Sequence, residues 1–264
     1  MATRDSILGP REPLADPAIS VRNLNVSLSG RVILKDVNFD VPRGTTLAIM
    51  GLSGVGKSTT LRCLVGLQKP DGGEVLVDNR NILHLSRKEL DLLRQRVGMV
   101  FQMPALFDSL TIGENVAFGL REHTRLPEEE IQRVVAEKLA IVDLEGMGHL
   151  LPNQLSGGMQ KRASLARTIA TDPDVILYDE PTTGLDPILS RVINELILDL
   201  QRRLNATSIV VTHDIAGALL VAHRIAMLHR GEIVWIGSAP EFETTGNEFV
   251  VQFREGRVQG PIRV

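Results

Sequence analysis

The sequence has little of what would tie a protein to an oxidising compartment, a membrane interior or a nucleic acid. It contains a single cysteine, Cys63, which excludes an intrachain disulfide and a four-thiolate zinc site. It has no run of about 18 uncharged apolar residues, the length that a membrane-spanning helix needs. Its formal net charge is only −3, which provides no overall attraction to nucleic acid. We therefore expect no nucleic-acid partner, and a membrane function would require another chain to span the bilayer.

The rest of the composition is that of a folded protein. Apolar residues make up 43% and charged residues 23% of the 264 residues, which is ordinary for a globular chain. The length allows one large core with an appended subdomain, or two small domains. Residues 1–17 mix charges with prolines and lack a continuous apolar stretch, so we expect a flexible N-terminal tail there.

Two strand patterns predict an α/β fold. Apolar residues alternate between Ile19 and Val41, which indicates half-buried antiparallel strands. Later apolar runs lack alternation, as do parallel strands that are covered on both faces: TLAIM (46–50), VGMVF (97–101), VILY (175–178) and SIVVT (208–212). Helix signals separate these runs, among them the capping box of Ser86 and Glu89. The mostly helical region from about 103 to 170 reads as a subdomain inserted into the α/β core.

The stretch GLSGVGKST, Gly51 to Thr59, is typical of a phosphate-binding loop, because it follows an apolar strand and opens a helix. Its glycines let backbone amides point at phosphate oxygens, and the helix N-terminus adds a partial positive charge. Lys57 would reach the β and γ phosphates, and Ser58 would hold Mg²⁺. The nucleotide-binding residues predicted in this loop are Gly51, Ser53, Gly54, Val55, Gly56, Lys57, Ser58 and Thr59.

Polar residues stand at the ends of the other apolar runs. Asp179 and Glu180 follow VILY, and we expect Asp179 to position Mg²⁺ and Glu180 to polarise the attacking water. Gln102 follows VGMVF and would coordinate Mg²⁺ or that water, and His213 follows SIVVT and would contact the γ phosphate. The acidic pair alone could be a helix-capping pair, and Gln102 or His213 alone would more often be a hydrogen-bonded strand end. Their convergence on one edge of a parallel sheet favours a catalytic site.

A second glycine turn, LSGGMQKR at Leu155 to Arg162, also opens a predicted helix and so prepares a chain to meet an anion. Together with the phosphate loop, the strand ends and TGLDP (183–187), it resembles the nucleotide-binding subunit of ABC transporters. The resemblance implies an ABC ATPase domain over residues 18–240, with a P-loop NTPase core. It also implies that Ser156, Gly157 and Gly158 contact the γ phosphate of ATP held by a second copy of the chain, and that Asp186 lies between the copies.

Three longer stretches are similar to the ATPases of the Mla phospholipid system and of other transporters with MCE domains: 105–127 (ALFDSLTIGENVAFGLREHTRLP), 151–159 and the tail segment 250–262 (VVQFREGRVQGPI). This family implies a homodimer beneath a multispanning permease of the MlaE type, linked indirectly to an MCE-domain lipid-binding protein. ATP with Mg²⁺ would drive lipid transport from the cytoplasmic face of the inner membrane, where the chain is peripheral.

Two other functions share part of this pattern. The ATPase of an importer for polar molecules such as amino acids has the same catalytic motifs, and only the LREHT and tail stretches argue against it. A soluble ABC ATPase acting on DNA or ribosomes usually has long coiled coils or tandem cassettes, and this chain has one cassette without heptads.

The sequence departs from the ABC pattern in the region expected to contact the adenine of ATP. Aromatic residues make up only 3% of the chain, and the region VSLSGRVIL offers Leu28 or Ser29 where an aromatic ring commonly stacks on the base. We expect an aliphatic adenine contact near Arg31 and a modest nucleotide affinity.

Some features allow only ordinary interpretations. We expect Trp235 to pack in a strand and Arg167 to pair with a carboxylate. The apolar cluster Met103 to Phe107 fits either the subdomain core or a groove for a permease helix. The C-terminal extension, 241–264, is too sparse to form its own core. We expect its residues Phe249, Val250 and Phe253 to dock on the partner copy and reinforce the dimer.

Overall fold

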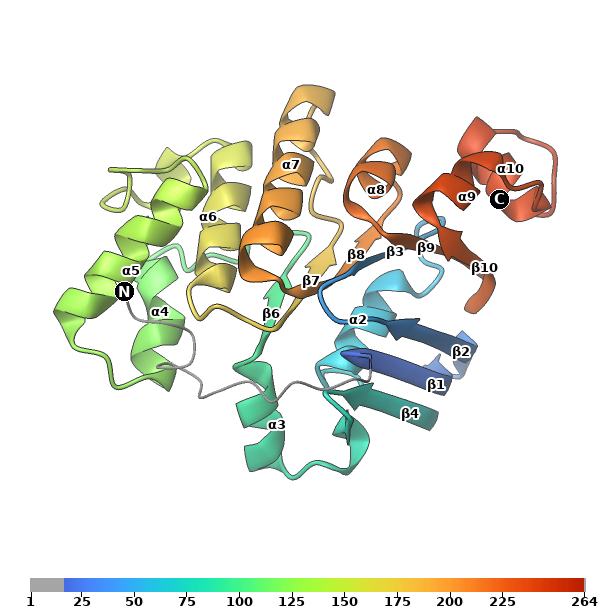
Figure 1. The fold of residues 1–264 in the computed structure, drawn as a ribbon, viewed down its shortest axis with the longest axis horizontal. Helices are drawn as coiled ribbons and strands as arrows, with labels where there is room; N and C mark the ends of the chain where they lie inside the picture. Colours follow the sequence, from blue (N-terminus) through green and yellow to red (C-terminus); the bar gives the residue numbers. More distant parts are fainter. Residues whose placement is uncertain (1–16, 264) are drawn as a thin grey trace.

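The computed structural model describes residues 17–263, which form two β-sheets surrounded by helices (Figure 1). The tail expected over residues 1–17 therefore lies, apart from Pro17, outside the described residues. Within 17–263, every helix is too short or too polar to cross a membrane.

The larger sheet has six strands in the order β10-β9-β3-β8-β7-β6. Its first five strands along the chain run parallel, and β10 pairs antiparallel with β9 at one edge. The strands are β3 (Thr46–Met50), β6 (Val97–Val100), β7 (Val175–Asp179), β8 (Thr207–Thr212), β9 (Arg224–His229) and β10 (Glu232–Ser238). All four apolar runs form strands of this sheet, so the predicted parallel core is confirmed. The apolar pattern missed only the parallel strand β9.

The smaller sheet is antiparallel in the order β2-β1-β4-β5. It consists of β1 (Ile19–Leu28), β2 (Arg31–Val41), β4 (Gly72–Val77) and β5 (Arg80–Asn81). The pairing of Ile19 with Val41 confirms the antiparallel layer that the alternation predicted. Its apolar face packs with α2 (Lys57–Leu64), α3 (Arg87–Arg94) and one face of the larger sheet, to which Leu177 of β7 belongs.

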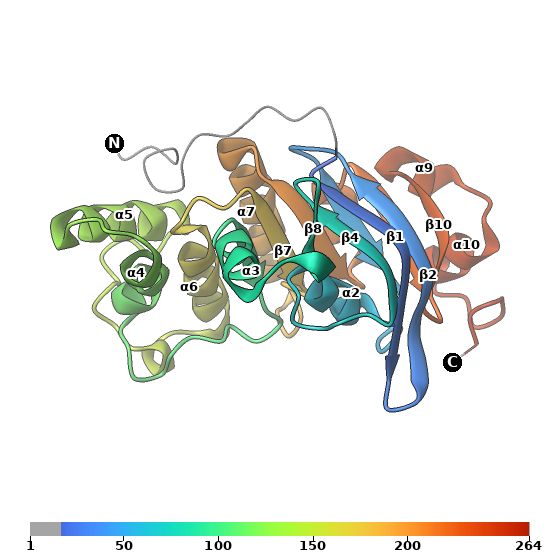
Figure 2. The same cartoon turned by 90° about the horizontal axis from the view of Figure 1, so that it is seen from below.

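The opposite face of the larger sheet is covered by helices that belong to a second apolar cluster, which includes Ile176 and Tyr178 of β7. Burial of both faces explains why β7 shows no apolar alternation. The covering helices are α4 (Ile112–His123), α5 (Glu128–Ile141), α6 (Gly157–Ile169), α7 (Pro187–Leu204) and α8 (Ile215–Val221). Short 3-10 turns η1 (Ile82–His84) and η2 (Pro152–Gln154) lie between the longer elements. In both ribbon views α4, α5 and α6 gather at one end of the molecule (Figures 1 and 2).

Local sequence determines where several helices begin. Ser86 and Thr111 each form a capping box with a glutamate three residues later, at the starts of α3 and α4. The carboxylate of Asp186 accepts the backbone N–H groups of Ile188 and Leu189, and Pro187 occupies the first turn of α7. The capping box expected at Ser86 is thereby confirmed.

The C-terminal extension forms α9 (Ala239–Thr244) and α10 (Glu248–Glu255), which lie beside β10 at the end opposite α4 to α6 (Figure 1). Val250 is fully buried against Ala48, Met50 and Phe242 of the same chain. Its predicted docking on a partner copy is therefore wrong, because the side chain completes its own core. The corresponding prediction for Phe249 and Phe253, which are partly buried, stays open.

Candidate nucleotide-binding site

The phosphate loop joins β3 to α2 at the carboxyl edge of the parallel sheet. Two of its glycines are required by close approach of the backbone to other elements. At Gly51, with φ 153°, a Cβ would lie 2.2 Å from the carbonyl oxygen of Leu228. At Gly56, with φ 109°, a Cβ would lie 2.6 Å from Leu34 Cδ2. No side chain caps α2, so the first N–H groups of this helix are left for an anion.

Lys57 is held inside the loop. Its side chain is only 5% exposed, and its Nζ donates to the carbonyl oxygens of Gly51 at 2.9 Å and Leu52 at 3.0 Å. The same Nζ lies 3.2 Å from Glu180 Oε1. A buried ammonium group fixed at three points is a well-placed cation for a phosphate group.

Ser58 and Asp179 meet at the start of α2. The Ser58 hydroxyl donates to Asp179 Oδ1 at 2.6 Å, so two oxygen ligands from separate elements lie side by side. Among the described residues, no group of three or more His, Cys, Asp or Glu side chains could hold a metal. Mg²⁺ typically uses one or two protein oxygens and completes its shell with phosphates and water. The pair therefore fits a Mg²⁺ ion that arrives with a nucleotide.

Glu180 lies in a sharp turn directly after β7. Its φ angle is 48°, a left-handed conformation that is uncommon for a residue other than glycine. Such conformations are often found at functional sites. Its Oε2 contacts His213 Nδ1 at 2.7 Å and accepts from Thr183 Oγ1 at 3.3 Å. The carboxylate is 10% exposed, while the His213 side chain is 57% exposed. One buried carboxylate thus links Lys57, Thr183 and His213.

These residues share one cavity of about 370 Å³. Most of the predicted site residues line it: Ser53, Gly54, Gly56, Lys57, Ser58, Thr59, Gln102, Glu180 and His213. Gly51 and Asp179 do not line it but contact Lys57 and Ser58, which do, and Val55 packs against the core. Sequence reasoning missed Ile33 and Thr183, which also line the cavity. Thr183 belongs to the noticed TGLDP turn, but only the fold reveals its contact with Glu180.

Gln102 reaches the cavity from beyond the end of β6. Its backbone carbonyl accepts a hydrogen bond from Lys161 Nζ at 2.9 Å, which ties it to α6. Nearby, Arg167 donates to the carbonyl oxygens of Ala105 at 2.6 Å and Pro104 at 3.4 Å. The expectation that Arg167 pairs with a carboxylate is therefore wrong. Burial lowers the pKa of its guanidinium.

The second glycine turn lies outside this cavity. Ser156 caps α6 by accepting the Met159 N–H at 3.3 Å. Gly157 is exposed, and a Cβ there would have no atom within 4 Å, whereas Gly158 is buried near Leu189. Asp186 is also exposed and caps α7. Within one chain these four residues do not join Lys57 and Glu180.

The parallel sheet, the glycine loop around Lys57 and the acidic strand end define a nucleotide-binding domain of the P-loop class. Residues 34–183 match the family model described as ABC transporter, and the chain belongs to this family. The chain is 44% identical to the intermembrane phospholipid transport system ATP-binding protein MlaF of Haemophilus influenzae, over 93% of each chain. It is 42% identical to the probable ribonucleotide transport ATP-binding protein mkl of Mycobacterium leprae, over 93% of this chain and 71% of that one.

The solved structures agree on the fold. The ATP-binding cassette MJ0796, in a dimeric post-hydrolysis state bound to ADP and Pi, superposes with a TM-score of 0.77. It is 36% identical, and the match covers 84% of this chain and 98% of that chain. The predicted P-loop NTPase fold and the ATPase class are confirmed.

Proposed function

We propose that this chain is the ATP-hydrolysing subunit of a phospholipid transporter and works as a homodimer beneath a membrane permease. The observation that carries the proposal is the meeting of Lys57, Ser58, Glu180 and His213 around one cavity in an ABC ATPase, with Asp179 bonded to Ser58. The name of the Haemophilus relative supports phospholipid as the cargo.

The phosphate loop would bind the triphosphate of ATP. The uncapped amides at the start of α2, with those of residues 51–59, would donate to the phosphate oxygens. Lys57 would exchange its contact with Glu180 for the β and γ phosphates, because these carry more negative charge than one carboxylate. That exchange would free Glu180 when the substrate is present.

Ser58 and Asp179 would hold Mg²⁺, directly or through water, and Gln102, which lines the same cavity as Ser58, would coordinate the ion or the attacking water. When bound, Mg²⁺ neutralises charge on the β and γ phosphates. The Ser58 hydroxyl oxygen, which lies beside Asp179 Oδ1, would serve as one ligand of the ion.

Glu180 would accept hydrogen bonds from the attacking water and orient it toward the γ phosphate. His213 lies 2.7 Å from its carboxylate and would contact the γ phosphate from the other side. Phosphoryl transfer depends mainly on positioning and charge stabilisation, and this cluster of fixed polar groups supplies both.

The second copy would complete each site. Ser156 and Gly157 are exposed at the start of α6, with Gly158 next to them, and all three would donate to a γ phosphate presented by another chain. Asp186 would lie between the copies. The dimeric state of the related cassette with ADP and Pi supports this arrangement.

The partners would be a multispanning permease of the MlaE type and, through it, an MCE-domain lipid-binding protein. The chain would then be peripheral on the cytoplasmic face of the inner membrane. Exposed Met103 and Phe107, beside Gln102, would contact the permease, since closure at the phosphates must be transmitted to the membrane subunit.

The test is to purify the tagged full chain from membranes of its own organism, in unsubstituted form and as Glu180→Gln. We expect ATP hydrolysis by the first form only, copurification of a multispanning protein, and ATP-dependent movement of labelled phospholipid in vesicles. Recovery without a membrane partner would overturn the transporter assignment. ATP-dependent movement of a ribonucleotide or an amino acid, with none of phospholipid, would overturn the cargo and retain the ATPase.

A further inference from the structure

His213 makes its contact with Glu180 although its own ring is 57% exposed. An exposed ring has little packing to fix its rotamer, so the position of its backbone decides whether the contact forms. His213 belongs to the segment between β8 and α8. The next residue in that segment, Asp214, holds it in place through hydrogen bonds.

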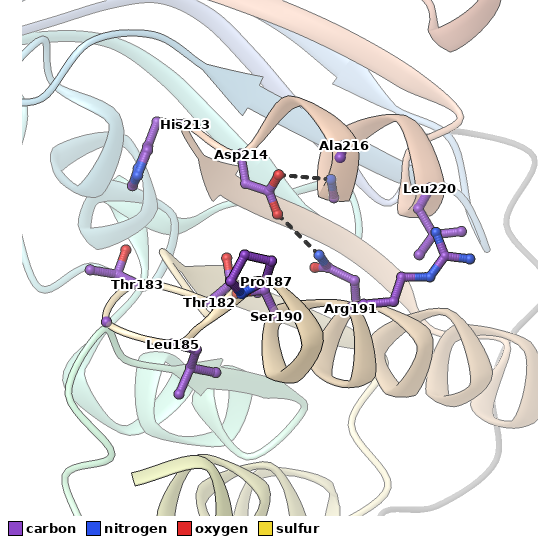
Figure 3. A pocket seen from close by; sticks show the side chains of 13 residues that line it. Thr182, Thr183, Leu185, Pro187, Ser190, Arg191, His213, Asp214, Ala216 and Leu220 are labelled. Atoms are coloured by element: carbon purple, nitrogen blue, oxygen red, sulfur yellow. Dashed lines mark hydrogen bonds between the residues drawn. The ribbon is translucent and has the colours of Figure 1, made fainter.

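Asp214 fixes this segment through three hydrogen bonds. Its own N–H donates to Thr212 Oγ1 at 3.0 Å, and its Oδ1 accepts the Gly217 N–H at 3.0 Å, which caps α8. Its Oδ2 accepts from Asn194 Nδ2 at 3.1 Å. Figure 3 shows the Asp214 carboxylate with both of its oxygens engaged, next to a cavity of about 400 Å³ that His213 also lines.

Asn194 brings α7 into the arrangement. It is 4% exposed, so its amide group is directed by the fold rather than by solvent. Close packing at this point admits no side chain at Gly217, where a Cβ would lie 2.4 Å from both Asn194 Nδ2 and Asp214 Oδ2. The helix α7 that carries Asn194 begins directly after Asp186.

Two contacts of the Glu180 carboxylate, one with His213 and one with Thr183, both lead back to α7. On one side its Oε2 contacts His213, which adjoins Asp214 and thereby Asn194. On the other side the same oxygen accepts from Thr183, in the turn that leads back to Asp186 and α7. A shift of α7 would move both contacts of that oxygen together.

We propose that Asn194 is a positioning residue for ATP hydrolysis. Through Asp214 it fixes His213 against Glu180, and it connects this pair to the helix that begins at Asp186. The inference rests on the proposed hydrolytic function and adds a residue that touches neither nucleotide nor metal.

The experiment exchanges the two ends of the hydrogen bond in the purified full chain. Asn194→Asp places a second carboxylate against Asp214 and should lower kcat for ATP hydrolysis about tenfold, with KM for ATP within about twofold. Adding Asp214→Asn lets Asn at 214 donate to Asp at 194 while its oxygen still accepts Gly217 N–H. The double variant should recover most of the lost kcat.

Controls separate positioning from folding. Gln201→Leu removes another buried amide of α7, which donates to the Gly44 carbonyl far from His213, and should change Tm but not kcat. Asn194→Leu keeps the volume without the donor and should lower kcat like Asn194→Asp. It serves as the second variant if Asn194→Asp does not fold.

The proposal is overturned if folded Asn194→Leu has normal kcat, if only KM changes, or if the double variant is no more active than Asn194→Asp. The unsubstituted chain and Glu180→Gln are assayed beside them. An active unsubstituted chain with inactive Glu180→Gln keeps the proposed function, whatever Asn194 does.

Discussion

The two glycine turns of this chain both lead into a helix, but the structure gives them opposite surroundings. GLSGVGKST is enclosed, since Gly51 and Gly56 leave no room for a side chain and Lys57 is 5% exposed. LSGGMQKR stands open, since Ser156 and Gly157 are exposed and outside the cavity. The first turn has its polar partners within the chain, whereas Ser156 and Gly157 of the second turn lie apart from Lys57 and Glu180, and its Lys161 contacts the backbone carbonyl of Gln102.

The two turns require glycine for different reasons. In the enclosed turn, glycine is demanded by the fold of the same chain. In the open turn, a Cβ at Gly157 would meet no atom within 4 Å beyond its own helix backbone and chain neighbours, so the described part of the chain does not demand glycine there. We therefore expect the need for glycine at position 157 to come from a ligand or from a second copy of the chain. The predictions below test this contrast.

The largest effect is expected at the enclosed site. Glu180→Gln keeps the shape of the side chain but removes the charge that contacts Lys57 and His213. We expect kcat to fall about a thousandfold while ATP still binds, because the water loses its orienting base. The variant should accumulate as a closed dimer with ATP, seen by sedimentation. Glu145→Gln, an exposed exchange of the same kind, is the control, and normal turnover of Glu180→Gln would refute the assigned role.

The second prediction concerns the open turn. Gly157→Asp should fold normally, because the position is exposed and uncrowded. It should lower kcat about a hundredfold, since a carboxylate at this helix start would repel the γ phosphate. Circular dichroism and ATPase assays check the two expectations.

Mixing two variants tests whether each ATP site is built from one chain or from two. In a heterodimer of Gly157→Asp with Lys57→Ala, one composite site keeps an intact phosphate loop and an intact second turn. We expect measurable ATPase activity from the mixture and almost none from either variant alone. If the mixture stays inactive although heterodimers form, the second turn does not serve a neighbour's site.

Features that depend on residues close together along the chain could be predicted from the sequence. Strand β3, the glycine loop and α2 follow one another, and their spacing alone indicates phosphate binding. The ends of β6, β7 and β8 could be placed on one edge because parallel strands share their direction. Residues such as Gln102 and His213 followed from that rule.

Contacts between distant segments could not be predicted. Arg167 was expected to find a carboxylate, but the fold brings the carbonyl oxygens of Ala105 and Pro104 to it. Val250 looked available to a partner because the extension is sparse in apolar residues, yet it is buried in a cluster that includes Ala48 and Met50 of β3. The bond from Asn194 to Asp214 spans twenty residues and has no sequence signature.

A third prediction compares the turns by stability. Gly51→Ala would force a Cβ to 2.2 Å from Leu228 O, so we expect the free energy of unfolding to fall by about 2 kcal/mol. Gly157→Ala, in the first turn of α6, should change it by less than about 0.5 kcal/mol, because alanine suits a helix and has space there. Urea denaturation of both variants checks this, and equal losses would remove the contrast between the turns.

The smallest effect is expected at the β1–β2 hairpin, where we expect the adenine of ATP to bind. Leu28 pairs with Arg31 across the β1–β2 hairpin, and Arg31 shares its face with Ile33, which lines the cavity. Leu28→Tyr would therefore add an aromatic ring on the cavity side of the hairpin. We expect ATP to bind about fivefold more tightly, since such stacking is worth about 1 kcal/mol.

Val32→Tyr is the matched control for this substitution. Val32 lies between Arg31 and Ile33 and so points to the opposite face of β2, where it is 64% exposed. Titration of ATP into each variant should show tighter binding for Leu28→Tyr only. If Leu28→Tyr leaves the affinity unchanged, the adenine does not use this face, and the missing aromatic residue is not the cause of a modest affinity. If both variants bind more tightly, the gain reflects general attraction of the base to exposed rings rather than a defined stacking position.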